Sequence, residues 1–499
     1  MGKEKVSPLA ASENSVKKYL SGKEWVIYLV AVFFYTNMTG MIAEYRKAYL
    51  VDIMMLDENR MAFFNSFTSI AGFALSFVYA MILDNRKPKN GQKFKRLGIL
   101  AAIPCGLVTF LIFYAPSFIA NNPNIFLAYI IILAVVQGLV FYFGNTVNLV
   151  AMVMSPNAKE REKLISFRQI SSSVGNSAPL VIVMVMGVIV KAINHGESNT
   201  ALNYLLSAGL CSVIGTITML LGMSVVKERI TYKQEAKKNP LMGFADVLKN
   251  KHARIVLYSE FLKSFRGIAT FMQPFIAAAM LGSSSKTLFF ALPVGIGTMC
   301  GMLIVNFLLK RLSARVIYIG SGIYSVLANL IAFGVGYLKL TREDMSWLQI
   351  PFIICLWLVG LQFGASNLLP HQFQADILDD LELKTQKRLD GSLPFVLTIG
   401  STLSATIAST VAPYILYGDK SIIHYVQGLE DGTQQGLKTK ILLLFFYTVV
   451  HGIMMFLAGV PFFFYKLTGK EKDRVHEEVL AQRAMIAAQN GETTEVNNG

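Results

Sequence analysis

Long apolar stretches separated by short polar connections run through almost the whole chain. Twelve of them approach or exceed the roughly 20 apolar residues that an α-helix needs to cross a membrane. A backbone in hydrocarbon must satisfy its own hydrogen bonds, so each stretch is predicted to be helical. The pattern predicts an all-α membrane protein with twelve transmembrane helices, at 25–52, 60–83, 97–119, 126–154, 165–190, 203–225, 253–281, 288–309, 316–338, 350–373, 393–416 and 441–466.

Basic residues are unevenly divided between the connections on the two sides of these helices. With the N-terminus inside, the inner connections together hold 22 Lys and Arg, and the outer ones hold 8. Cytoplasmic loops of membrane proteins carry such an excess of Lys and Arg. We therefore expect a multi-pass protein of the plasma membrane with both termini in the cytoplasm.

The longest inner connection divides the chain into two halves of six helices each. We expect a cytoplasmic N-terminal segment, a first half, a central cytoplasmic loop, a second half and a cytoplasmic tail, at 1–24, 25–225, 226–252, 253–466 and 467–499. A weak internal repeat supports the division, because Phe143–Leu149 and Phe363–Leu368 place small and amide residues at equivalent points of the two halves. Internal repeats are common in secondary transporters.

Composition restricts the function further. The chain is 54% hydrophobic and 15% charged, whereas soluble domains carry about 25% charged residues. Its net charge of +15 is explained by the basic inner loops and does not predict nucleic-acid binding. The 4 cysteines lie in apolar stretches without metal-ligand spacing, and Met1–Glu24 lacks the apolar core of a cleaved signal. No nucleotide loop or nucleophile motif is present, so we expect a protein that is not an enzyme and has no cofactor.

Charged residues inside a membrane span are costly and therefore point to function. The seventh span carries Lys263, Arg266 and Gln273 at helical spacing, with Glu260 one turn before Lys263. Two interpretations stay open: a neutralised internal ion pair, or cations that line a cavity and meet a polar or anionic solute.

Other spans contribute further polar residues. In the first span, snorkelling at the outer rim is as good an explanation as ligand contact. In the fifth, the polar face suits helix packing as well as a hydrated path. In the tenth, a hydrogen-bonded buried histidine is the ordinary alternative to a protonation role. The candidate substrate-binding residues are Asn37, Glu44, Asn145, Asn148, Arg168, Lys263, Arg266, Gln273, Gln362, Asn367 and His371.

The most densely charged stretch, Ala375–Gly391, lies between two apolar stretches and is predicted to be an inner loop. Its mixture of both signs allows ion pairs that break and re-form, although an ordinary solvated loop has the same composition. The hypothesis is a latch that closes the inner gate by pairing with the two other inner loops. Its candidate residues are Asp84, Arg86, Lys93, Glu160, Arg161, Asp376, Asp379, Glu382, Lys384 and Arg388.

Three inner-loop motifs together resemble those of a known transporter family. Asp84–Arg96 is similar to a D-R…G-K-F-R-P element, Asn157–Arg168 to E-R…L-x-S-Y-R, and Ala375–Arg388 to A-D…D…E-x-K-T-G-x-R. In this order they resemble the glycoside–pentoside–hexuronide:cation symporters, the melibiose-permease-like branch of the major facilitator superfamily. The resemblance implies two six-helix halves, a central cavity, a carbohydrate solute and a coupling cation, H⁺ or Na⁺.

The chain departs from this family at the cation site. The family's two acidic residues of the second span fall at Gly72 and Ser76, and that of the fourth span at Gly144 or Asn145. The family's lysine of the eleventh span falls at Thr402. Because neutral groups bind a hard cation weakly, we expect little stimulation by Na⁺.

The sequence thus predicts a secondary active transporter that moves a sugar, glycoside or sugar acid by alternating access, with cation symport as the expected coupling. The expected partners are a small-molecule solute and the lipid bilayer, and the expected oligomeric state is a monomer. Two alternatives stay open: a carrier of another solute such as an organic anion or a lipid-like molecule, uncoupled or differently coupled, and a non-transporting sensor on the same scaffold.

Overall fold

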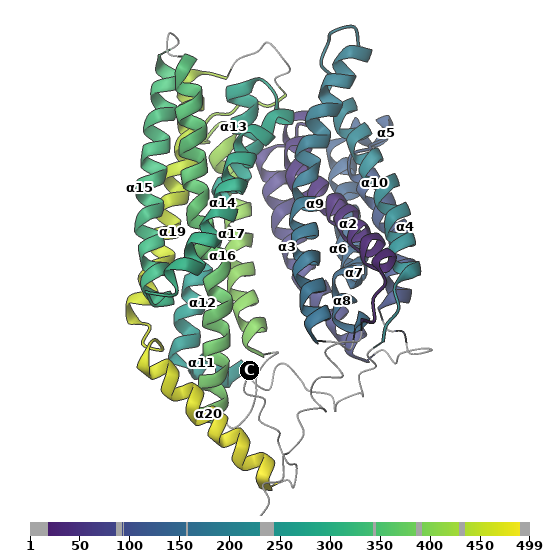
Figure 1. Cartoon of the computed structure of the whole chain (residues 1–499). Helices are drawn as coiled ribbons and strands as arrows, with labels where there is room; N and C mark the ends of the chain where they lie inside the picture. The colour runs from purple at the N-terminus through teal and green to yellow at the C-terminus, as the bar shows by residue number, and fades with distance from the viewer. Residues whose placement is uncertain are drawn as a thin grey trace, which may run out of the picture. The chain divides into compact units, whose positions relative to one another are not determined.

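Helices make up almost all of the chain that can be described (Figure 1). The computed structural model describes residues 18–85, 92, 94–155, 158–229, 244–342, 346–385, 392–428 and 435–489. The apolar stretches form these helices because a helix satisfies its backbone groups internally. The chain divides into two compact units between Ala236 and Lys237, and each is described by itself.

Unit 1 contains the first part of the chain together with two short later segments, Gly282–Leu288 and Val426–Thr433. Asn203 donates a hydrogen bond from Nδ2 to Oγ of Ser285 at 2.9 Å, which ties the first of these segments to unit 1. Its helices are α2 (Gly22–Ala48, continued by a π-helical turn at Tyr49–Ile53), α3 (Glu58–Asn85), α4 (Lys95–Ile112), α5 (Ser117–Ala120), α6 (Pro123–Gly144), α7 (Thr146–Leu149), α8 (Ala151–Met154), α9 (Ala158–Ile193) and α10 (Thr200–Val225).

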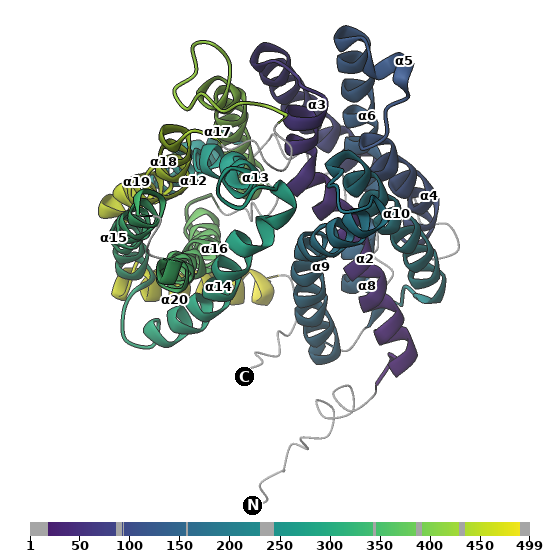
Figure 2. The same ribbon diagram turned by 90° about the horizontal axis from the view of Figure 1, so that it is seen from above.

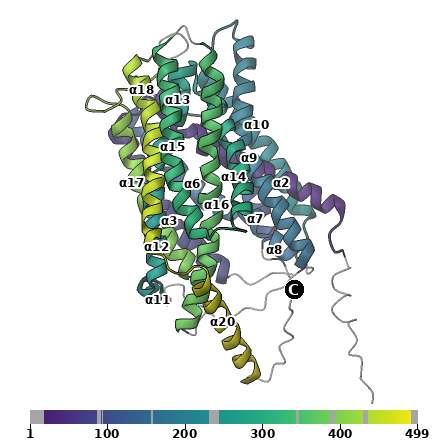
Figure 3. The same ribbon diagram turned by 60° about the vertical axis from the view of Figure 1, so that its left-hand side comes forward.

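Unit 2 contains the second set of helices. Figure 2 looks along them and shows α14 and α15 near α16, and Figure 3 shows α20 leaving the bundle at its lower end. Its helices are α11 (Phe244–Lys249), α12 (Lys251–Ser264), α13 (Gly267–Leu281), α14 (Leu288–Leu308), α15 (Ala314–Thr341), α16 (Gln349–Thr385), α17 (Ser392–Leu416), α18 (Leu437–Phe445), α19 (His451–Gly459) and α20 (Lys470–Gln489).

Ten helical segments of the described chain are long and apolar enough to cross a membrane, so the architecture is that of a multi-pass membrane protein. The predicted number of twelve is not confirmed. Two predicted spans lie outside this set. One is α3, and the other is the seventh span, which is split at Phe265 and Arg266 into α12 and α13 of 14 and 15 residues.

The predicted inner loop Ala375–Gly391 is not a loop over its first part. Residues Ala375–Thr385 are the last turns of α16, and the remaining residues lie outside the described chain. The helix continues because Lys384 Nζ donates to Oδ2 of Asp380 one turn away at 2.8 Å, while Ile377 and Leu381 stay buried. At about 1.5 Å per residue this helix is long enough to extend beyond a hydrocarbon core of roughly 30 Å.

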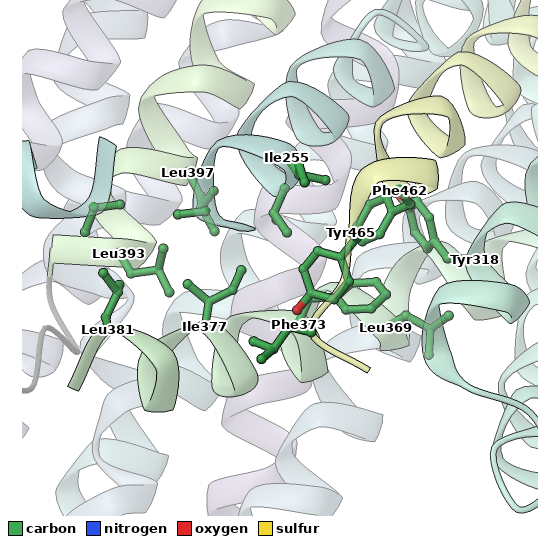
Figure 4. Close-up of a cluster of buried hydrophobic side chains, with 14 of the residues drawn as sticks. Ile255, Tyr318, Leu369, Phe373, Ile377, Leu381, Leu393, Leu397, Phe462 and Tyr465 are labelled. Atoms are coloured by element: carbon green, nitrogen blue, oxygen red, sulfur yellow. The ribbon is translucent and has the colours of Figure 1, made fainter. Parts of the chain in front are cut away.

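Buried apolar side chains of α12, α15, α16, α17 and the segment after α19 form a core at one end of unit 2. Figure 4 shows Phe373, Tyr465 and Phe462 at its centre, with Ile377, Leu381, Leu393 and Leu397 beside them. Phe373 and Phe462 approach to 4.5 Å between ring centroids. Such aromatic contacts add to the stabilisation gained from burial alone, so this core holds the helix ends of unit 2 in place.

Two pairs of glycines bring α14 and α16 close together. A Cβ on Gly301 would lie 2.1 Å from the carbonyl oxygen of Leu361, and one on Gly364 would lie 2.2 Å from the carbonyl carbon of Gly301. Gly297 and Gly360 repeat this arrangement one turn earlier. Small residues four apart allow membrane helices to pack backbone against backbone. This contact positions the stretch of α16 that carries several candidate site residues.

Candidate functional site

A cavity of about 380 Å³ lies in unit 2, a volume typical of pockets for small ligands. It brings together three of the predicted substrate-binding residues, Lys263, Asn367 and His371. Their cavity neighbours come from α12, α16 and α17: Glu260, Ser366, Pro370, Gln374, Pro394, Leu397, Thr398 and Ser401. Hydroxyl, amide and charged groups thus face one space, and Leu397 connects this lining to the apolar core of Figure 4.

An ion pair borders this cavity. Nζ of Lys263 donates to Oε1 of Glu260 at 2.5 Å, and their side chains are 14% and 15% exposed. The pairing follows from the three-residue spacing, which places both side chains on one helix face. The internal pair considered in the sequence therefore exists, and both of its members also line a cavity. The two interpretations of the seventh span are compatible.

Arg266 occupies the break between α12 and α13. Its guanidinium carbon lies 5.1 Å from the centroid of the Phe363 ring, within range of a cation–π contact. Its Nη1 is buried and has no hydrogen-bond partner. Interrupted membrane helices are common at the binding sites of transporters. The break thus places the cationic side chain of Arg266, with its buried and unpartnered Nη1, inside the helical unit.

The Phe363 ring is also in contact with His451, at 5.0 Å between ring centroids. His451 is 4% exposed, and its Nε2 has no hydrogen-bond partner. It begins α19 directly after a π-helical turn, Phe446–Val450, a feature frequent at functional sites. The sequence analysis missed His451, although an ionisable side chain in an apolar span was the signal that could have identified it.

Gln362 lies one helical turn before Ser366, on the same face of α16 as the cavity lining. It is 2% exposed, and both polar atoms of its side chain lack hydrogen-bond partners. Gln273 is half-buried in α13 and is not among the residues that line the cavity. The three residues predicted from the tenth span, Gln362, Asn367 and His371, thus lie in or next to the cavity.

The predicted site residues of the first half form a separate group in unit 1. Asn148 donates from Nδ2 to Oδ1 of Asn145 at 2.9 Å, and Arg168 donates to the carbonyl oxygen of Asn148 at 3.3 Å. The group lies where the fourth predicted span breaks into α6, α7 and α8. The predicted span 126–154 is nevertheless one candidate membrane-crossing segment, Pro123–Met154, because Asn145 and Val150 between the short helices keep helical dihedral angles.

Two further candidates belong to α2 of unit 1. Asn37 is fully buried, and neither polar atom of its side chain has a hydrogen-bond partner. Glu44 is half-buried nearer the end of the same helix. The neighbouring Arg46 donates to Oε1 of Gln137 at 2.8 Å. This hydrogen bond holds the Arg46 side chain within unit 1, so the side chain does not extend toward the membrane surface.

The charged end of α16 pairs mainly with α20. Asp376 accepts from Nζ of Lys472 at 2.8 Å, and Oδ2 of Asp379 lies 3.3 Å from Nδ1 of His476. Glu382 is half-buried on the same turn of α16. The gate hypothesis for these residues stays a prediction, with partners on α20 added to those considered. Five gate candidates have positions or side chains outside the described chain: Asp84, Arg86, Lys93, Arg161 and Arg388.

Glu160 is held within unit 1. Its carboxylate accepts hydrogen bonds from the backbone N–H groups of Tyr19 and Leu20 and, at 2.5 Å, from Oγ of Ser155. Partial burial alone would raise the pKa of Glu160, but these hydrogen bonds outweigh burial and, with the charge of Arg229, lower it. This carboxylate therefore orders the start of α2 and α9.

Arg229 connects the end of unit 1 to α2. Its two terminal nitrogens donate to the two carboxylate oxygens of Glu24 at 2.9 and 2.8 Å, and Nη1 also donates to the carbonyl oxygen of Met154. The hydrogen bonds to Glu24 raise the pKa of Arg229 above its ordinary value. A bidentate contact of this kind is among the stronger polar interactions in proteins.

The positions that depart from the related cation site carry no acidic group. Gly72 offers only its carbonyl oxygen, which accepts from the Tyr142 hydroxyl at 3.0 Å, and Oγ of Ser76 donates to the carbonyl oxygen of Phe73. Among the described residues, no group of three or more His, Cys, Asp or Glu could hold a metal ion. At Gly72 and Ser76 the structure therefore offers carbonyl and hydroxyl oxygens.

The chain is similar in sequence to known transporters. The sequence profile described as MFS/sugar transport protein matches residues 27–469. A candidate glycoside/cation symporter, YagG of Escherichia coli (strain K12), is 23% identical over 81% of this chain and 83% of its own. A candidate sulfoquinovose importer of Salmonella typhimurium (strain LT2) is 26% identical over 90% and 87%.

The fold is also similar to that of solved transporters. The crystal structure of a D-xylose-proton symporter aligns with a TM-score of 0.59 at 14% identity, over 90% of this chain and 98% of that one. The family expected from the inner-loop motifs is confirmed by the profile match over most of the chain. The chain belongs to the MFS/sugar transport protein family, and it is a multi-pass membrane transporter and not an enzyme.

Proposed function

We propose that this transporter moves a sugar, glycoside or sugar acid and that the unit 2 cavity contributes to its binding site. The observation that carries the proposal is the cavity in which Lys263, Asn367 and His371 meet the hydroxyl groups of Thr398 and Ser401. Sugars are recognised by hydrogen bonds to their hydroxyl groups, and ligand sites combine few such polar groups with apolar walls. The named substrates of the relatives, a glycoside and sulfoquinovose, support a carbohydrate.

The moving bodies in this proposal are the two six-helix halves, 25–225 and 253–466, acting by alternating access in the plasma membrane. The basic inner connections favour cytoplasmic termini. In this proposal the transporter acts as a monomer, with both halves contributing to one site. Asn145, Asn148 and Arg168 are the corresponding candidates of the first half.

The coupling ion in this proposal is a proton. YagG is described as a cation symporter, yet Gly72, Ser76 and Thr402 stand where this branch has its charged groups. Hard cations need oxygen ligands, of which carboxylates are the strongest here. Glu260 and His371 both line the cavity, which makes them the candidate residues for this coupling.

The test is uptake of labelled sugars into proteoliposomes that contain the purified full-length chain, with H⁺ gradients, Na⁺ gradients or neither. We expect uptake above that of protein-free liposomes, accelerated by an inward H⁺ gradient. Ser401→Leu should reduce it by narrowing the cavity, whereas the exposed control Ser117→Leu should not. Binding without flux would instead favour a sensor. Flux of only non-carbohydrate anions or lipid-like molecules would overturn the carbohydrate assignment.

A further inference from the structure

Basic side chains of unit 2 gather where several membrane-crossing segments end. The span ends in question are Leu308, Ala314 and Phe464, and each basic residue lies within one helical turn of one of them. The ends of spans lie at the depth of the lipid headgroups. We call these basic residues the boundary patch: Lys310, Arg311, Arg315 and Lys466.

The boundary patch joins two turns that are far apart in the chain. Arg315 at the start of α15 donates a hydrogen bond from Nη2 to the carbonyl oxygen of Phe463 at 2.7 Å. Lys466 follows shortly after Phe463 in the segment that leaves α19. One turn along α15, the ring of Tyr318 packs on that of Phe462 at 4.5 Å between centroids, and both rings are drawn in Figure 4. The two turns therefore form one surface.

Exposed aromatic side chains lie on the membrane side of this surface. Phe307, Phe463 and Phe464 are 58%, 52% and 65% exposed. They occupy the last turns of two candidate spans, so lipid acyl chains cover them when the chain crosses a bilayer. The surface thus presents apolar rings to acyl chains and positive charges to headgroups.

The positive charge of the boundary patch is not neutralised by the chain itself. The sequence contains no Asp or Glu within 300–320 or 459–470. In the part of the chain that the structure describes, none of the patch side chains belongs to an ion pair. An anion from outside the protein is therefore needed to balance this charge.

Both arginines of the patch are oriented by the protein. The guanidinium carbon of Arg311 lies 5.7 Å from the centroid of the Phe307 ring, within range of a cation–π contact, and Arg315 is held by the carbonyl oxygen of Phe463. Neither partner carries a charge, so both arginines keep theirs. Ordered guanidinium groups match the oxygens of a phosphate, whereas a flexible lysine acts only as a point charge.

We propose that the boundary patch binds the headgroup of an anionic phospholipid. The phosphate oxygens accept hydrogen bonds from Arg311 and Arg315, and Lys310 and Lys466 add positive charge around them. The acyl chains lie along the exposed aromatic rings. Basic residues at this depth each strengthen the binding of anionic lipids about fivefold. This lipid site is separate from the cavity and does not depend on which solute is transported.

The experiment is native mass spectrometry of the purified full-length chain in detergent, titrated with phosphatidylglycerol or with phosphatidylcholine. Both lipids carry the same acyl chains, so they differ only in the headgroup. We expect the first phosphatidylglycerol to bind at least about tenfold more tightly, because several basic residues contribute. Excess inorganic phosphate should not displace it, because the acyl chains also hold the lipid.

Variants assign this preference to the boundary patch. Lys310→Gln combined with Lys466→Gln should weaken the binding of phosphatidylglycerol about tenfold or more. Both side chains are exposed and make no contact that holds the fold, so this variant remains folded. Arg311→Gln should weaken binding about fivefold, and Arg311→Lys should weaken it less. Lys191→Gln removes an exposed charge near the end of another span and is the matched control.

Several outcomes would overturn the inference. Equal affinity for the two lipids would show that headgroup charge is not recognised, and displacement by inorganic phosphate would show a site for soluble anions. An unchanged affinity in the double lysine variant, or the same loss in Lys191→Gln, would place the binding elsewhere. None of these results bears on sugar transport, which the liposome assay tests by itself.

Discussion

Nζ of Lys472 on α20 donates to Oδ1 of Asp376 on α16 across 2.8 Å, and this pair attaches the last helix to the charged end of α16. Lys472 is 47% exposed, so the pair is worth at most about 1 kcal/mol. Val475 and Val479 of the same helix are buried in the apolar core of unit 2. The attachment of α20 therefore depends more on the two valines than on the ion pair.

Val479→Asp should detach α20, because an aspartate cannot remain in that core without a partner, whereas Lys472→Gln should leave the helix docked. Limited proteolysis of the purified chain, read by mass spectrometry, should show rapid cleavage within 470–489 only in Val479→Asp. Glu477→Gln, which changes an exposed residue of the same helix, is the control. Equal cleavage of Lys472→Gln and Val479→Asp would mean that the ion pair is the main attachment.

Gly301→Val should destabilise unit 2 severely, because its side chain would collide with the backbone of α16 at Leu361. Backbone cannot yield as a flexible side chain does, so we expect a loss of about 3 kcal/mol or more, or failure to fold. Gly295→Ala lies on the same helix with nothing within 4 Å of its added Cβ and should be neutral or slightly stabilising. Thermal unfolding followed by size-exclusion chromatography distinguishes these outcomes.

Glu160→Gln should lower the stability of unit 1 at neutral pH by about 1–3 kcal/mol, because it weakens several hydrogen bonds to a charged acceptor. The folded-state pKa of Glu160 is lowered, so its carboxylate stabilises the fold fully above the unfolded pKa of about 4.3. That contribution is lost as the pH falls through the lower folded pKa.

The measurement is the difference in melting temperature between wild type and Glu160→Gln at several pH values. It should stay constant between pH 8 and pH 5.5 and shrink only below about pH 4.5. The control Glu477→Gln removes an exposed carboxylate of α20 and should show a much smaller difference. A difference that already vanishes near pH 6 would contradict the lowered pKa.

Sodium should stimulate transport by the wild-type chain by less than about twofold. Adding two carboxylates to α3 should increase this stimulation. Gly72 has open space around its Cβ position, and Ser76 follows one turn later, so Gly72→Asp with Ser76→Asp places two acidic groups on one helix face. The double variant should gain Na⁺ dependence in the liposome assay. Gly72→Ala with Ser76→Ala is the size control. Strong Na⁺ stimulation of the wild type would mean that the cation site lies elsewhere.

The helical architecture and the family could be predicted from sequence because both depend on local patterns. Apolar length fixes the spans, and the inner-loop motifs are contiguous in the chain. The same reasoning failed for Ala375–Thr385. Charges exclude a segment from hydrocarbon, but they do not say whether the segment continues as a helix in water, and here Asp380 and Lys384 support the helix.

The candidate site was partly accessible from sequence. Lys263 and Arg266 stood out as costly charges, and His371 and Asn367 followed a stripe on their own helix. His451 and Phe363 are far apart in the chain and meet only in the fold, where α16 and α19 both pack on α15. The break at Arg266 also escaped prediction, although a basic residue followed by Gly267 is a local signal typical of a helix end.

The continuous course of α16 has a mechanical consequence. Gln362 near the middle of the helix and Thr385 at its end are separated by about 35 Å at ~1.5 Å per residue. A tilt of roughly 10° about Gln362 would carry the tip by about 6 Å. We expect a displacement of this size to be large enough for a fluorophore on exposed Lys384 to report whether α16 tilts when a solute is added.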